Sequence, residues 1–91
     1  MEKVGVGERF SQLVLEVDVA LRRCRAAIAR GGGGHELVQA ALALGQMLGY
    51  LEAISDLQPG EHANAVERAR QMVGELESLR VELATRSRRL L

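Results

Sequence analysis

Apolar residues recur along most of the chain at alternating spacings of three and four positions. This is the period of an α-helix that buries one face, and no stretch alternates with the period of two that a strand would show. In the first segment the apolar stripe consists of Phe10, Val14, Val17, Leu21, Cys24 and Ile28. The pattern predicts an amphipathic helix over residues 7–30.

The last third of the chain repeats this pattern as a near-heptad series. Its members are Ala65, Ala69, Met72, Leu76, Leu79, Leu83 and Leu90, and Arg86 is the only interruption. A helix from about residue 61 to near the end of the chain would be roughly 45 Å long, against roughly 35 Å for the first helix. We expect its last turns to extend beyond their neighbours and fray, or to contact another chain.

Two breaks separate the helices. Residues 31–34 are four consecutive glycines, whose backbone entropy is too high to continue a helix, so we expect a flexible connector. Pro59 has no amide proton and clashes with a preceding helical turn, so residues 58–60 are expected to form a turn. The three predicted helices span residues 7–30, 35–57 and 61–88. Their short connections predict one all-α domain over residues 1–91, an antiparallel up-down-up array of three helices.

The middle helix contains two internal glycines, each of which costs up to about 1 kcal/mol relative to alanine. Ala41, Gly45, Gly49 and Ala53 are spaced four apart and therefore stack as one ridge of small side chains. We call these four residues the small-residue ridge. Such a ridge lets another helix approach closely, and that contact can offset the cost of the glycines.

The middle helix is apolar over most of its circumference. A second stripe contains Leu37, Leu44, Leu48 and Leu51, and further apolar residues are Val38, Leu42, Met47 and Ile54. One helical partner cannot cover so much apolar surface. The ridge therefore packs either between the first and third helices of a monomer or against its own copy across a two-fold axis.

We expect a homodimer or a larger helical bundle, because a 91-residue core is small and the third helix is long. On this interpretation Gly45→Leu or Gly49→Leu should disrupt close helix packing and cost several kcal/mol through overpacking.

Composition and charge exclude several classes of protein. Twelve basic and twelve acidic residues cancel, so no overall field attracts nucleic acid or a membrane surface. Eleven of the basic residues are Arg, which is typical of a GC-rich bacterial genome. The single cysteine excludes an intrachain disulfide, and the start of the chain lacks the pattern of a signal peptide. The apolar region 37–51 is shorter than the ~20 residues that span a bilayer. We expect a cytoplasmic protein with no membrane partner.

No catalytic constellation can be assembled from these residues. His35 and His62 each neighbour a Glu at a predicted helix start, but neither has the spacing of a metal-ligating pair. The glycine run lacks the Lys and the Ser or Thr of a phosphate-binding loop. Cys24 is expected to be a buried, inert thiol, although nearby arginines leave thiolate stabilisation as an alternative. We therefore predict no catalytic residue, no metal, no cofactor and no enzymatic activity.

Two groups of arginines remain as a candidate anion patch. The patch consists of Arg22, Arg23 and Arg25, whose group in the sequence also contains Arg30, and of Arg86, Arg88 and Arg89. Both groups are near predicted helix C-termini, where cations interact favourably with the helix dipole. The alternative is a weak, salt-dependent site for an anion or RNA. The missing aromatic stacking residues and the balanced charge disfavour nucleic acid as a partner.

The function we predict is association without catalysis, through self-assembly and contact with another protein. The candidate interface residues are Ala41, Gly45, Gly49, Ala53, Leu44, Leu48, Leu51, Leu76, Leu79, Leu83 and Leu90. One alternative is a chaperone or adaptor whose helical groove binds an amphipathic client segment. A further alternative is a nucleic-acid-binding module that uses the arginine groups.

Overall fold

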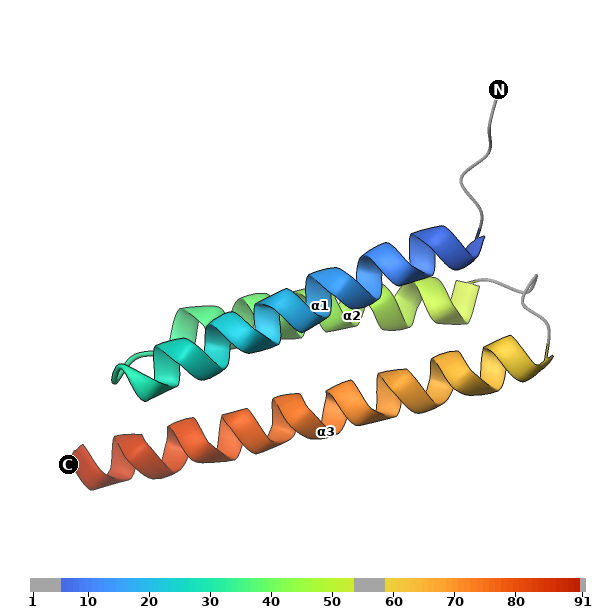
Figure 1. Ribbon diagram of the computed structural model, residues 1–91. Helices are drawn as coiled ribbons and strands as arrows, with labels where there is room; N and C mark the ends of the chain where they lie inside the picture. Colours follow the sequence, from blue (N-terminus) through green and yellow to red (C-terminus); the bar gives the residue numbers. More distant parts are fainter. Residues whose placement is uncertain (1–5, 54–58, 91) are drawn as a thin grey trace.

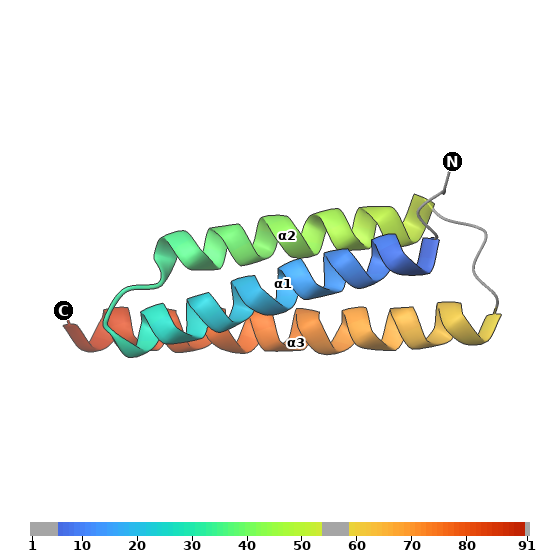
Figure 2. The same cartoon turned by 45° about the horizontal axis from the view of Figure 1, so that its top comes forward.

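The computed structural model describes residues 6–53 and 59–90 and contains three α-helices (Figure 1). They are α1 (Val6–Ala29), α2 (Gly34–Ala53) and α3 (Pro59–Leu90). The helices run up, down and up, and two views of the molecule show them packed side by side (Figure 2). No strand is present in the described ranges. The predicted all-α class and three-helix array are confirmed.

The helix boundaries lie within two residues of the predicted ones, apart from the end of the middle helix. Pro59 is the first residue of α3, where a turn over residues 58–60 was expected. A proline is favourable there because the first residue of a helix has no use for its amide proton, and its fixed φ suits the helix. The predicted end of the middle helix, residues 54–57, lies outside the described residues.

The connector between α1 and α2 is a hydrogen-bonded helix cap, not the flexible link that its composition predicted. Gly31 adopts a φ of 96° and donates its amide to the carbonyl of Ile28 at 3.0 Å. Gly32 donates to the carbonyl of Ala27 at 2.9 Å. This pair of bonds is the Schellman motif, which satisfies the last carbonyls of a helix. Gly33 follows with a φ of 120°, and a Cβ there would lie 2.5 Å from Ile28 Cγ1.

The core runs along the centre of the bundle and contains only apolar side chains. Its buried members are Leu13, Val17, Leu21, Cys24, Ala27, Ile28, Ala40, Leu44, Met47, Leu51, Ala65, Ala69, Met72 and Leu79. The contact between α1 and α2 is the most extensive, while α3 packs against both. No described helix has the length and apolar character needed to cross a bilayer.

Two polar contacts join α3 to α1 across the bundle. Arg25 forms an ion pair with Glu75. Farther along, Arg86 donates a hydrogen bond of 2.8 Å to the carbonyl oxygen of Ile28. Its Nη2 atom also lies 3.3 Å from Oε1 of Glu82. Arg86 interrupts the heptad series because its side chain reaches a carbonyl in the last turn of α1. Beyond this point α3 extends past the α1–α2 connector, as its predicted length required (Figure 1).

Candidate protein-association surface

The small-residue ridge of α2 faces away from the core. Ala41, Gly45, Gly49 and Ala53 are all exposed. A Cβ built at Gly45 or Gly49 meets no described atom of another element within 4 Å. The two glycines of the ridge therefore contact no other described element of their own chain.

Two large apolar side chains share this exposed side of α2. Val38 is 57% exposed and Leu42 is 64% exposed. Because α-helical residues three, four and seven apart share a face, both lie beside the ridge. The resulting α2 face consists of Val38, Ala41, Leu42, Gly45, Gly49 and Ala53. These six side chains are uncharged, and the exposed Gln46 and Glu52 lie beside them, three residues before and three residues after Gly49.

Most leucines predicted to form an interface belong to the core instead. Leu44, Leu51 and Leu79 are buried, so they are occupied within the chain. Leu48, Leu76 and Leu83 are partly buried against the same core, and the side chain of Leu90 lies outside the described residues. Sequence reasoning left Val38 and Leu42 out of the candidate interface. Val38 and Leu42 each lie three and seven residues before members of the ridge. This spacing places both residues on the face of the ridge and could have been read from the sequence.

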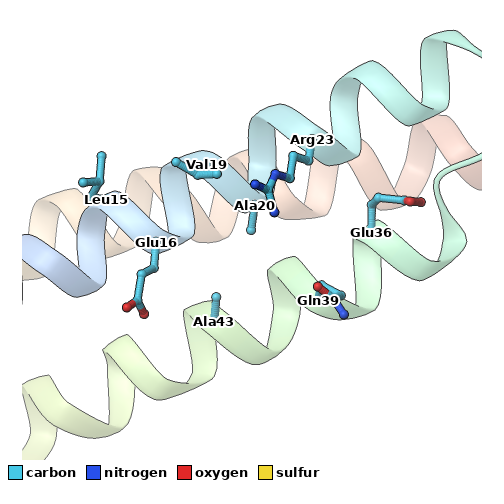
Figure 3. A pocket seen from close by; sticks show the side chains of 8 residues that line it. All are labelled: Leu15, Glu16, Val19, Ala20, Arg23, Glu36, Gln39 and Ala43. Carbon is cyan, nitrogen blue, oxygen red and sulfur yellow. The ribbon is translucent and has the colours of Figure 1, made fainter.

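A groove of about 400 Å³ runs between α1 and α2, next to the α2 face (Figure 3). Glu16 on α1 and Ala43 on α2 point into it from opposite sides, while Leu15 and Val19 lie along its outer edge on α1. Leu15 is 62% exposed. The remaining lining residues are Ala20, Arg23, Glu36 and Gln39.

A second groove, of about 440 Å³, runs between α2 and α3 on the other flank of α2. Its lining includes the exposed Val73 together with Leu48 and Val66. The two grooves and the α2 face together hold five of the six large apolar side chains that are exposed in the described part of the chain; the sixth is Val81. Exposed apolar surface is thus concentrated around α2.

Cys24 is fully buried and unsuited to chemistry. Its Sγ lies 3.9 Å from the carbonyl oxygen of Gly33. Burial raises the pKa of the Cys24 thiol, and the charge of Glu36 raises it further, against a smaller opposing effect of Arg25. These effects favour the neutral thiol and oppose the thiolate that nearby arginines were considered able to stabilise.

The histidines lie apart from any cluster of acidic or thiol groups. The Nε2 atoms of His35 and Gln39 are 3.3 Å apart on the surface of α2, and His62 lines the groove between α2 and α3. Within residues 6–53 and 59–90, no three His, Cys, Asp or Glu side chains gather closely enough to hold a metal ion.

Three of the six arginines in the candidate anion patch have carboxylate partners. Nη2 of Arg22 lies 3.0 Å from Oδ2 of Asp18. Arg25 forms an ion pair with Glu75, and Arg86 forms one with Glu82. The other three differ in their positions: Arg23 lines the α1–α2 groove, Arg88 is exposed, and the side chain of Arg89 lies outside the described residues. The paired carboxylates reduce the positive field that an anion would meet.

Comparisons with known proteins give no match to a family model, a curated protein or a solved structure. Inference about function therefore starts from the geometry of the α2 face and its two flanking grooves.

Proposed function

We propose that this protein acts without catalysis, through protein–protein association, and that the α2 face is its self-association surface. One observation carries the proposal: the six residues of the α2 face are small or apolar and exposed, and its two glycines contact no other described element. Each glycine costs up to about 1 kcal/mol in a helix interior. Burial of this face against a second copy would offset that cost by permitting close approach of two helices.

The adaptor alternative would use the same region of the molecule. In that case an amphipathic segment of a different protein would cover the α2 face or the α1–α2 groove. Self-association is favoured because a single charged residue of α2, Glu52, lies beside the α2 face, whereas the α1–α2 groove contains Glu16, Arg23 and Glu36. The ion pairs of Arg22, Arg25 and Arg86 disfavour the nucleic-acid alternative.

The test is the solution mass, measured by light scattering after size exclusion over a dilution series. The wild-type chain should be a dimer or larger and should dissociate on dilution. Gly45→Leu should be monomeric, because the leucine keeps the two helices apart. Gly74→Leu is the matched control: Gly74 is an exposed glycine within α3, with no described atom of another element within 4 Å of an added Cβ, and its substitution should leave the mass unchanged.

A wild-type chain that stays monomeric at every concentration would contradict self-association and leave the adaptor alternative. An unchanged mass for Gly45→Leu would equally exclude the α2 face as the surface used.

A further inference from the structure

The carboxyl-terminal end of α1 obtains a cation from another helix. The last turn of α1 contains no basic residue. Among the described side chains, Arg86 of α3 is the one that donates a hydrogen bond to a carbonyl of that turn. A cation near the last carbonyls of a helix stabilises the negative end of the helix dipole. For α1, this stabilisation is therefore available when α3 is docked.

The acceptor of Arg86 also belongs to the cap of α1. The carbonyl oxygen of Ile28 lies 2.8 Å from Nη1 of Arg86 and 3.0 Å from the amide nitrogen of Gly31. A backbone carbonyl has two lone pairs, so both donors can be accepted at once. The amide of Gly32 closes the same turn on the carbonyl of Ala27. Arg86 and the connector thus hold one peptide group from two sides.

The start of α2 holds the other side of the connector. The carbonyl oxygen of Gly33 accepts the amide of Leu37 at 2.8 Å, and Sγ of Cys24 lies 3.9 Å from the same oxygen. Gly33 itself is buried. One short segment therefore joins the end of α1 to the start of α2 and, through Arg86, to the last third of α3 (Figure 2).

From this junction we infer a conformational coupling: docking of the α3 end and order in the α1–α2 connector depend on each other through Arg86. Leu79 is the last buried residue in the described part of α3, and beyond it Leu83 is partly buried against the core. Apolar burial thus holds this end weakly. Glu82 lies 3.3 Å from Nη2 of Arg86 and keeps the guanidinium in place.

The coupling acts in both directions, as any linkage between two equilibria must. When the end of α3 separates, α1 loses its cation and the connector loosens. When the turn at Gly31 opens, Arg86 loses a fixed acceptor and the end of α3 is held less firmly. Neither step requires a second copy of the chain, so this inference is independent of the proposed self-association.

Amide hydrogen exchange followed by NMR tests the first direction. Arg86→Met removes the charge and the donor but keeps a long, unbranched side chain. The amides of Gly31 and Gly32 should then exchange about fivefold faster, which is the effect expected for loss of a cation at a helix C-terminus. The amide of Leu21, in the buried middle of α1, should change less, because its exchange requires a larger opening.

Two further variants serve as controls. Arg80→Met removes another arginine of α3, one whose ion pair with Glu77 lies within its own helix. This change should leave exchange in the connector as it is in the wild type. Arg86→Lys keeps the positive charge and a donor, so it should restore most of the protection of Gly31 and Gly32.

A double-mutant cycle tests the reverse direction. Gly31→Ala perturbs the connector without altering Arg86, and urea denaturation gives the free energy of unfolding for each variant. If the two residues act through one junction, the loss for Gly31→Ala combined with Arg86→Met should be smaller than the sum of the two single losses.

Three results would overturn the inference. Unchanged exchange of Gly31 and Gly32 in Arg86→Met would mean that the connector does not depend on α3. Equal acceleration at Leu21 would mean that Arg86 contributes only to the stability of the whole bundle. Strictly additive losses in the cycle would contradict the coupling as well. The solution mass enters none of these measurements, so the proposed function is tested separately.

Discussion

Two glycine-containing regions of this protein, the α1–α2 connector and α2, use the residue for different reasons. In the connector, Gly31 and Gly33 adopt positive φ values, and a Cβ at Gly33 would collide with Ile28. In α2, Gly45 and Gly49 have ordinary helical geometry and open space where a Cβ would be. The folded chain explains the first pair of glycines completely and gives no reason for the second.

This difference separates the requirements of folding from those of association. A glycine that folding requires is recognised by its backbone angle or by a close neighbour in the same chain. A glycine that lowers helix propensity without either feature is a cost to the isolated chain. Gly74 in α3 has the same open space, but only the α2 glycines lie beside the exposed Val38 and Leu42, and their proposed justification is the approach of a second helix.

The largest effect is expected for Gly33→Ala. The substitution combines a positive φ with a Cβ only 2.5 Å from Ile28 Cγ1, so we expect a loss of about 3 kcal/mol in the free energy of unfolding. Urea denaturation measures it. Gly34→Ala, one residue later with no described atom within 4 Å of the new Cβ, is the control and should change stability little. Equal losses in the two variants would contradict the special role of Gly33.

A smaller loss is expected for Gly31→Ala, about 1–2 kcal/mol, because the positive φ is strained but the site is open. Gly31→Asn should recover part of the loss, since asparagine adopts the left-handed conformation more readily than alanine. Denaturant unfolding of both variants beside the wild type provides the measurement. If alanine and asparagine were equally tolerated, the helix cap would not depend on the backbone angle of Gly31.

The smallest effect is expected for Gly45→Leu. Its effect on stability should change sign with protein concentration. At protein concentrations where the chain is monomeric, the substitution should raise the unfolding free energy by about 0.5–1 kcal/mol through helix propensity. Gly74→Leu should give a similar gain. At high concentration only Gly45→Leu should fall below the wild type, because it forfeits association. Urea midpoints at the two concentrations test this.

A loss of stability for Gly45→Leu at every concentration would instead mean that the ridge packs inside the monomer. The sequence predicted that Gly45→Leu would lower stability through overpacking. Within the described chain this loss has no origin, because a Cβ added at Gly45 meets no described atom of another element. That prediction now applies only to an assembled form.

Local patterns in the sequence were sufficient for the helices. The three-and-four spacing from Phe10 to Ile28 predicted the buried stripe of α1, and the near-heptad series predicted the buried positions of α3 through Leu79. The role of Arg86 could not be predicted, since its acceptor, the carbonyl of Ile28, is 58 residues away in the chain. The cap at Gly31 was also missed, because glycine composition alone does not distinguish an ordered turn from a flexible one.

By itself, the sequence determined three amphipathic or apolar helices, their approximate ends and an aliphatic core, because helical periodicity and helix-breaking residues act over a few neighbouring positions. Only the tertiary structure decided which side of α2 is covered. A helix that is apolar around most of its circumference can turn several faces toward the core, and packing against α1 and α3 selected Leu44, Met47 and Leu51. That choice left Val38, Leu42 and the glycine ridge exposed.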